Sequence, residues 1–307
     1  EGCSCLDGRE SSRYQIRRTL VTMIPTITKK YQNVVISTGN IIATELGQRK
    51  SNEELYDGLK ITLHTDSTAE RVVVVKEIDE LHGRVQRATQ ELTTRLTENG
   101  RNEISIGAKI FLNRHSTESV NQAVEELLHI LSVTHVDNVV LAYHPNAVAT
   151  ATPVATTKPP CSEDSNVSRA TNWSQRNGKE GVAELKELYK TLEQYALKQQ
   201  ITQLGIADLD AAALEELHNS AQVVPTIAQV NLSTCCVVPP ELQEFCTAHD
   251  IQLNTHSDPE LLLPVEQFDG LVPGYTIDWT LRYQVHVRCR GVLTAKGYIV
   301  GASRSSV

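Results

Sequence analysis

Residues 201–232 read ITQLGIADLDAAALEELHNSAQVVPTIAQVNL. Two short apolar runs, 201–207 and 226–232, are typical of buried strands, and between them leucines recur at helical spacing over 210–221. Asp208 or Asp210 is the expected N-cap of that helix, because an aspartate side chain accepts hydrogen bonds from the first free amides. This order of strand, helix and strand predicts two parallel strands joined by a helical crossover.

The same alternation extends along the chain on both sides of this unit. A capping box at Ser51 and Glu54 begins one of the helices. The repeat is about 25 to 35 residues long, which predicts a (β/α) TIM barrel of the α/β class. A doubly wound open sheet is the alternative, although no glycine fingerprint follows any strand. Further strands are predicted at 34–36, 104–112, 136–143, 251–256 and 291–294, and helices at 51–63, 68–98, 118–133, 182–200, from Pro239-Pro240 onward and at 279–288.

The predicted barrel forms one domain over residues 34–307. Residues 1–33 are polar and mixed and show no clear period, so they form a poorly defined N-terminal segment. Residues 145–181 interrupt the pattern with prolines, glycines and many Thr, Ser and Asn residues. We interpret that stretch as a long mobile insertion.

The composition excludes several classes of protein. The 307 residues carry 29 Lys and Arg against 37 Asp and Glu, and the net charge of −8 argues against nucleic-acid binding. No apolar run approaches the roughly 20 residues of a membrane helix. The seven cysteines are thinly spread, lack the paired spacing of a zinc site, and follow no secretory signal. We therefore expect no metal, no membrane association and a reducing, cytoplasmic setting.

Three cysteines are candidates for redox contacts. The neighbouring Cys235 and Cys236 follow the strand at 226–232, on a loop at the C-terminal face of the barrel, where a thiol pair suits an intermolecular disulfide. Cys289 lies between Arg288 and Arg290, and cationic neighbours favour a thiolate. The alternatives are small buried apolar residues for the pair and an ordinary helix-end residue for Cys289.

Longer strings of the C-terminal half resemble known families. The segments LGIADL (204–209), LEEL (214–217), QVN (229–231), ELQEFC (241–246) and IQLNTHS (251–257) follow the pattern of aldo-keto reductases. The strings QVNLSTCCVVPPELQEF (229–245), DIQLNTHSDP (250–259) and WTLRYQVHVRCRGVLTAKGYI (279–299) more closely resemble the regulatory (modifier, light) subunits of glutamate–cysteine ligase. The resemblance covers about residues 104–298 and implies an aldo-keto-reductase-like barrel, abbreviated or irregular, that is not itself a reductase.

The resemblance also implies where a reductase site would lie. Reductases of this fold use a Tyr as general acid together with a Lys, an Asp and a His. Lys109 and His144 align with the Lys and the His, but Asp66 is followed by Arg71 where the Tyr should stand. Arginine stays protonated, so the tetrad is incomplete and both residues are vestigial or ordinary strand-end residues. The tyrosines left as replacement acids are Tyr14, Tyr31 and Tyr56.

A vestigial NADP(H) site is a second implication of the resemblance. Gln229 matches the glutamine that binds the nicotinamide amide, and Lys296 begins a segment like the adenosine-phosphate loop. Ala207-Asp208 replaces the family's Ser-Asn pair, and His256 replaces the stacking Tyr. No cofactor is required by this interpretation.

The resemblance thus implies a non-catalytic regulatory subunit. Such a protein binds the catalytic subunit of glutamate–cysteine ligase as a heterodimer, raises its apparent affinity for glutamate and relieves feedback inhibition by glutathione. Cys235, Cys236 and Cys289 are the candidates for an intersubunit disulfide. Two alternatives stay open: an NADPH-dependent aldo-keto reductase with a rearranged acid, and an NADP(H)-sensing binding protein on the same fold.

Overall fold

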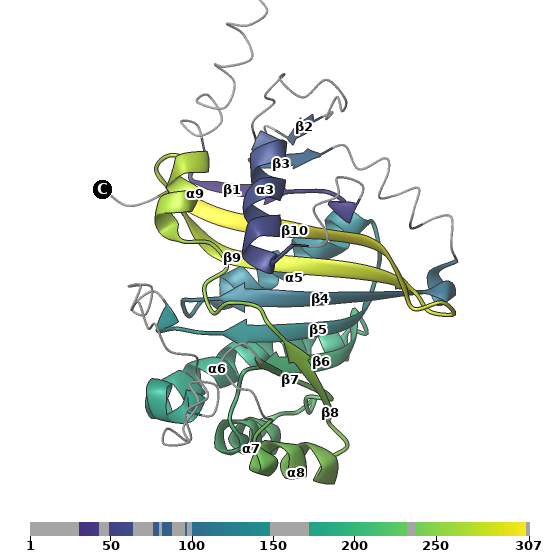
Figure 1. Ribbon diagram of the computed structural model, residues 1–307, viewed down its shortest axis with the longest axis vertical. Coiled ribbons are helices and arrows are strands. Elements are labelled where there is room, and N and C mark those ends of the chain that lie inside the picture. Colours follow the sequence, from purple (N-terminus) through teal and green to yellow (C-terminus); the bar gives the residue numbers. More distant parts are fainter. Residues whose placement is uncertain are drawn as a thin grey trace, which may run out of the picture.

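Ten strands form one sheet in the order β2-β3-β1-β10-β9-β4-β5-β6-β7-β8 in the described residues (Figure 1). The computed structural model describes residues 31–42, 49–63, 76–79, 82–87, 96, 100–147, 172–231 and 238–304. The strands are β1 (Asn33–Ser37), β2 (Lys76–Asp79), β3 (Arg84–Arg87), β4 (Ile104–Leu112), β5 (Val136–Tyr143), β6 (Ile201–Ala207), β7 (Ile227–Asn231), β8 (Gln252–His256), β9 (Tyr275–Val287) and β10 (Val292–Arg304).

The parallel half of the sheet confirms the repeat predicted from the sequence. Strands β4 to β8 are parallel neighbours in chain order. The helices of this half are α5 (Thr117–Leu131), α6 (Trp173–Leu197), α7 (Ala211–Ser220) and α8 (Pro240–Ala248). Asp210 is the N-cap of α7, where its carboxylate accepts a hydrogen bond from the amide of Ala213 at 2.9 Å. These crossovers bring the carboxyl ends of five strands to one edge of the sheet.

The antiparallel half corrects the prediction for the C-terminal region. Residues 279–288, predicted as a helix, belong to the strand β9, and the predicted strand at 291–294 extends as β10 to Arg304. Alternate residues of β9 are buried, namely Trp279, Leu281, Tyr283 and Val285. This period of two is the pattern of a strand, and burial of that face outweighs any local helical tendency.

The N-terminal region also differs from its prediction. Part of the expected helix at 68–98 is instead the hairpin of β2 and β3, whose strands pair antiparallel between 76 and 87. Gly83 adopts a positive φ of 65° in the connecting turn, a conformation that ends a helix. Most of the remaining residues of 68–98 lie outside the described part.

Helices cover both faces of the sheet (Figure 1). The helices α3 (Ser51–Leu63) and α9 (Val265–Leu271) lie on one face, over a core that includes Phe111, Val140 and Ile227. In a closed barrel, the corresponding face of the sheet would line the inside. The helices α5 to α8 pack on the other face, over the larger core. Since β2 and β8 stand at the two ends of the strand order, the described sheet is an open, abbreviated version of the expected barrel.

Two further expectations are revised by side-chain and helix positions. Helix α3 begins at Ser51 as predicted, but the Ser51 hydroxyl donates to Asp258 and the Glu54 carboxylate binds Lys296 and Tyr298. The expected insertion at 145–181 is helical from Trp173 onward, and the indole of Trp173 donates to the carbonyl of Tyr143 at 2.9 Å. Residues 1–30 and 148–171 lie outside the described residues.

Candidate functional site

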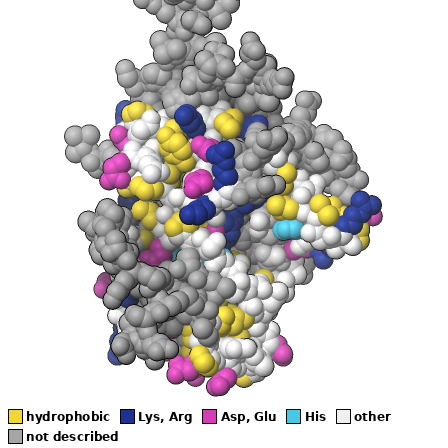
Figure 2. Space-filling view, viewed as in Figure 1, with side chains coloured by type: hydrophobic (Ala, Val, Ile, Leu, Met, Phe, Trp, Pro, Cys, Tyr) yellow, Lys and Arg dark blue, Asp and Glu magenta, His cyan; other side chains and the backbone are white. Residues whose placement is uncertain are grey.

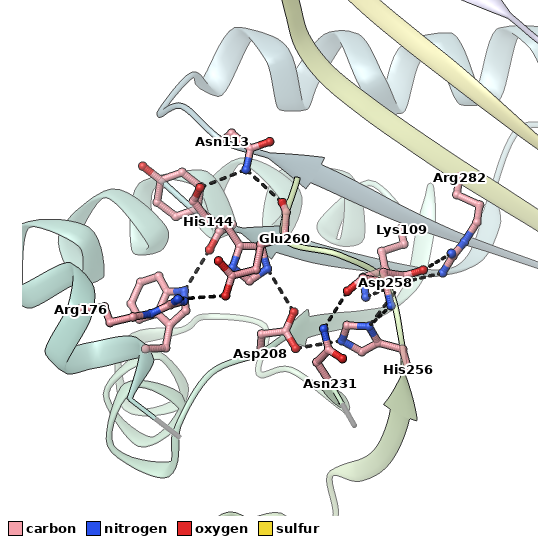
Figure 3. Close-up of polar contacts among 12 residues, drawn as sticks. Lys109, Asn113, His144, Arg176, Asp208, Asn231, His256, Asp258, Glu260 and Arg282 are labelled. Carbon is pink, nitrogen blue, oxygen red and sulfur yellow. Dashed lines mark hydrogen bonds and ion pairs between the residues drawn. The ribbon is translucent and has the colours of Figure 1, made fainter. Parts of the chain in front are cut away.

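Polar side chains gather where the parallel strands end (Figure 3). Lys109 lies near the end of β4, His144 directly follows β5, and Asp208 directly follows β6. Asn231 and His256 are the last residues of β7 and β8. The carboxyl ends of parallel strands are where α/β proteins build their sites, so this cluster is the candidate functional site.

Asp258 is the center of an ion cluster at this edge. Its Oδ2 lies 3.1 Å from Nζ of Lys109, and Arg282 binds the same carboxylate through both terminal nitrogens, one of them at 2.9 Å. The Ser51 hydroxyl donates to Oδ1 of Asp258 at 2.6 Å. The side chains of Lys109 and Asp258 are 4% and 5% exposed, so strand β4, strand β9, helix α3 and the loop after β8 meet in one buried contact.

Asp208 lies between two histidines in the same site. Its two oxygens accept hydrogen bonds from Nε2 of His144 at 3.0 Å and from Nε2 of His256 at 2.9 Å. The backbone amide of Asp258 donates to Nδ1 of His256 at 3.1 Å, which assigns the ring proton to Nε2. Nδ1 of His144 is buried and has no hydrogen-bond partner among the described residues. The two aspartates are therefore linked through the ring of His256.

The electrostatics of the cluster hold both carboxylates in their ionised form. Burial alone would raise the pKa of Asp258, but Arg282 and Lys109 outweigh it and lower that pKa well below its usual range. Burial likewise opposes ionisation of Asp208, whereas the hydrogen bonds from His144 and His256 lower its pKa. Burial lowers the pKa of Lys109 despite the opposing attraction of Asp258 and Asp208. Two cations and two anions balance, as a buried site requires.

An outer layer of contacts fixes the loop that carries Asp258. The amide of Asn231 donates to the carbonyl of Asp258 at 2.7 Å. Asn113 donates to the carbonyls of His144 at 3.0 Å and Glu260 at 3.1 Å, and Arg176 binds the Glu260 carboxylate at 2.9 Å. The loop after β8 is thus attached to the ends of β4 and β7 and to α6.

The structure brings together two of the site residues predicted from the sequence. Lys109 and His144 both lie in the cluster, but each faces an aspartate that the sequence did not predict as its partner. Tyr56 lies in an open depression beside Arg49 and Asn52, and the carbonyl of Tyr31 binds the Tyr275 hydroxyl. Tyr14, Asp66 and Arg71 lie outside the described residues, so the missing acid of the tetrad stays a prediction.

Of the three cysteines predicted as redox contacts, only Cys289 lies in the described residues. Cys235 and Cys236 lie outside the described residues, in the segment between β7 and α8. Cys289 is an exposed free thiol in the turn between β9 and β10, not at a helix end. The preceding Arg288 donates to the carbonyl of Ile104, at the amino end of β4. Cys289 therefore lies at the opposite edge of the sheet from the ion cluster.

The residues present do not fit the expected NADP(H) site as a whole. Lys296, the candidate phosphate ligand, is 9% exposed, and its ammonium lies 2.6 Å from Oε2 of the fully buried Glu54. An ammonium that is neutralised in this way is not free to hold a phosphate. Oε1 of Gln229 is buried without a hydrogen-bond partner among the described residues. Of the two residues predicted to bind NADP(H), Gln229 is therefore the one whose side chain is not already bound within the protein.

Asp258 and Arg282 belong to the site but are not predicted from the sequence. The helix predicted at 279–288 conceals the position of Arg282, which lies on β9 opposite Lys109 of β4. Asp258 lies two positions after the strand predicted at 251–256, and sites of α/β proteins occur at the carboxyl ends of strands. A separate finding concerns membranes: none of the described helices is both long enough and apolar enough to span one.

The sequence of the chain matches a known protein family. Residues 82–257 match the sequence profile described as "Aldo/keto reductase family". The chain belongs to the aldo/keto reductase family. Solved structures with the same description include an aldo-keto reductase of the silkworm Bombyx mori, 17% identical, with a TM-score of 0.36 over 53% of this chain and 42% of that one. An aldo/keto reductase from Brucella melitensis is 16% identical, with a TM-score of 0.35 over 51% and 47%.

Curated relatives define the particular group. The glutamate–cysteine ligase regulatory subunit of Homo sapiens is 31% identical over 284 residues, which is 88% of this chain and 92% of that protein. The subunit of the same name from Mus musculus is 29% identical over 283 residues, again 88% and 92%. Within the aldo/keto reductase family, the chain is therefore a member of the glutamate–cysteine ligase regulatory subunits.

Proposed function

We propose that this protein binds the catalytic subunit of glutamate–cysteine ligase and regulates it without catalysing a reaction itself. The observation that carries the proposal is the near full-length similarity to proteins of that name. The non-catalytic part rests on the incomplete tetrad, because Arg71 stands where the resemblance places the Tyr that delivers the proton. The proposed setting is the cytoplasm, which agrees with the free thiols of Cys246 and Cys289.

The regulation follows from a difference in binding free energy. The subunit raises the apparent affinity of its partner for glutamate and weakens glutathione inhibition if it binds the glutamate-competent conformation more tightly than the inhibited one. Because linkage is reciprocal, glutamate tightens the heterodimer and glutathione loosens it. A preference of about 1.4 kcal/mol changes an apparent affinity about tenfold.

The absence of reductase activity is proposed on the same geometry. A carbonyl reduction needs an acid that delivers a proton to the substrate oxygen. The amine of Lys109 is bound to a carboxylate, and Nε2 of His144 donates to Asp208. Lys109 and His144 are thus held by aspartates, and the Tyr that would deliver the proton is absent from the position where the resemblance places it.

A mixing experiment tests the proposed function. The purified catalytic subunit is assayed for γ-glutamylcysteine formation against glutamate, with and without glutathione and with and without this chain. We expect a lower apparent KM for glutamate, a higher inhibition constant for glutathione, and co-elution of the two chains on a sizing column. Unchanged kinetics together with separate elution would refute the proposal.

The proposed heterodimer includes a disulfide under oxidising conditions. We propose that Cys235 or Cys236 of this chain forms the disulfide with the partner, and the exposed Cys289 is the competing candidate. Cys235→Ser/Cys236→Ser is compared with Cys289→Ser in the oxidised mixture by non-reducing electrophoresis. Loss of the linked band in the double variant alone supports the pair, and loss in Cys289→Ser alone transfers the role to Cys289.

A further inference from the structure

The open sheet has two edges that differ in their protection. In the described residues, β2 stands at one end of the strand order and β8 at the other. Natural sheets protect their edges with charges, prolines or bulges, because an unpaired edge is a template for another strand. The sequence of β2 is Lys-Glu-Ile-Asp and is charged, whereas β8 reads Gln-Leu-Asn-Thr-His and has no Lys, Asp, Glu or Pro. Within the described part of the chain, the edge formed by β8 is therefore open to strand addition.

The backbone of β8 presents hydrogen-bonding groups away from the sheet. The strand is parallel to β7, and the amide of Gln252 donates to the carbonyl of Thr226 at 2.9 Å. Since alternate residues of a parallel strand bond to the same neighbour, the amides and carbonyls of Leu253 and Thr255 point away from β7. Thr255 is exposed, while Leu253 packs against the main core and holds the strand in place.

The surroundings of this edge are strongly acidic. Residues 199–281 contain twelve Asp or Glu and no Lys or Arg. Two of these acids, Asp208 and Asp258, belong to the ion cluster, but Glu241, Glu244 and Asp250 are exposed on α8 and in the turn that leads into β8. Figure 2 shows acidic side chains at the lower end of the molecule, where α7 and α8 lie in Figure 1. An incoming segment with basic residues complements this field.

We propose that the β8 edge is the docking surface for an extended, basic segment of the partner protein, which adds to the sheet as a further strand. The inference rests on the proposed function, which makes that partner the ligase catalytic subunit. A second copy of this chain is the poorer occupant, because pairing two β8 edges would bring two acidic α8 surfaces together. Main-chain hydrogen bonds to Leu253 and Thr255 supply the contact, as in other cases of strand addition.

Docking at this edge reaches the ion cluster directly. Strand β8 ends at His256, which binds Asp208, and Asp258 follows two residues later. A strand added beside Thr255 restrains the segment that carries both residues. The surface thus connects partner binding to the buried cluster through one short stretch of backbone.

Thr255→Pro tests the edge because proline removes the outward amide without removing a bond to β7. Thr255→Val keeps the amide and is the matched control. Binding of each variant to the catalytic subunit is measured by titration, and its fold by circular dichroism. We expect Thr255→Pro to bind about tenfold more weakly than the wild type, since a main-chain hydrogen bond is lost and the added strand is obstructed. Thr255→Val stays within about twofold of the wild type.

Two further measurements keep the test decisive if Thr255→Pro does not fold. Hydrogen exchange of the wild-type chain is expected to slow at residues 253 and 255 when the catalytic subunit is added. Glu244→Lys is expected to weaken binding about threefold at low salt and not at high salt, whereas Glu53→Lys on α3 leaves binding unchanged.

The outcomes separate this inference from the proposed function. Wild-type chain that does not bind the catalytic subunit refutes the proposed function and the inference with it. Binding that is normal in Thr255→Pro, or exchange that is unchanged at 253 and 255, refutes the docking surface alone. If Thr255→Pro instead abolishes self-association of the free chain, the occupant is a second copy and the inference is wrong.

Discussion

The ammonium of Lys109 lies 3.1 Å from the carboxylate of Asp258, and both side chains are at least 95% buried. The carboxylate comes from the loop after the last parallel strand, whereas the ammonium comes from β4. The contact neutralises the charge of Lys109 and joins that loop to the sheet. The cluster therefore stabilises this edge of the sheet.

Asp258→Asn is expected to destabilise the fold strongly. The substitution removes the carboxylate that Arg282 and Lys109 share, and an uncompensated buried cation costs about 3 kcal/mol or more. Chemical denaturation followed by circular dichroism measures the free energy of unfolding. Glu266→Gln, at an exposed position in the first turn of α9, is the control and is expected to change it by less than about 0.5 kcal/mol. A small effect of Asp258→Asn would contradict the structural role.

The stability of the protein is expected to fall in acid because of Asp208. Its pKa is lowered in the folded state, so the group contributes stability above the unfolded pKa of about 4 and loses it as the pH falls further. The drop in melting temperature between about pH 5 and about pH 3 is expected to be smaller in Asp208→Asn than in the wild type. Equal drops in both proteins would show that Asp208 does not contribute, and Glu244→Gln controls for the loss of any one carboxyl group.

Glu54 and Lys296 form a second buried pair whose members are expected to depend on each other. Lys296→Met leaves the carboxylate of Glu54 buried with Tyr298 as its remaining donor, at 2.8 Å, and is expected to cost about 3 kcal/mol. The double variant Glu54→Gln/Lys296→Met is expected to be less destabilised than the sum of the two single variants. A double-mutant cycle of unfolding free energies measures this, and strict additivity would contradict the pairing.

The same pair leads to a prediction about NADPH. Since the ammonium of Lys296 is bound to Glu54, we expect no saturable change in NADPH fluorescence on titration with the wild-type chain. An NADPH-consumption assay with a broad set of aldehydes is likewise expected to show no turnover. Saturable binding with turnover would favour the reductase alternative, and saturable binding without turnover the sensor alternative.

Two of the cysteines are expected to differ sharply in reactivity. Cys289 is exposed, whereas Cys246 is 2% exposed in the core between α8 and the sheet, where burial raises the pKa of its thiol. Iodoacetamide is expected to label Cys289 in the native protein and Cys246 only after denaturation, as measured by mass spectrometry of the digest. Equal native labelling would contradict the burial of Cys246.

Much of the fold could be predicted from the sequence, because local pattern and tertiary context agree in the parallel half. The strand at 201–207, the Asp210 cap and the proline that begins α8 were all predicted from neighbouring residues. The antiparallel half was not predicted because β9 pairs on one side with β4, which is distant in the chain, as well as with β10, which follows it directly. Its alternation of Trp279, Leu281, Tyr283 and Val285 carried the signal.

The candidate site was predicted in part for a related reason. Lys109 and His144 could be found by their place at strand ends and by resemblance. Their partners could not, since the contact of Lys109 with Asp258 joins residues that are 149 positions apart. Lys296 resembled a phosphate ligand in its local sequence, and the buried Glu54 that occupies it is 242 positions away.

The strand order also has a consequence for the growing chain on the ribosome. Among the described strands, the first, β1, pairs with β3 on one side and with the last, β10, on the other. The N-terminal hairpin is joined to the parallel half only through β10 and β9 in the described sheet. During synthesis, strands β4 to β8 emerge from the exit tunnel before residues 275–304, so the parallel half can assemble first. The N-terminal strands gain their pairing partner β10 only after that, so the two ends of the described chain close the sheet in its last step.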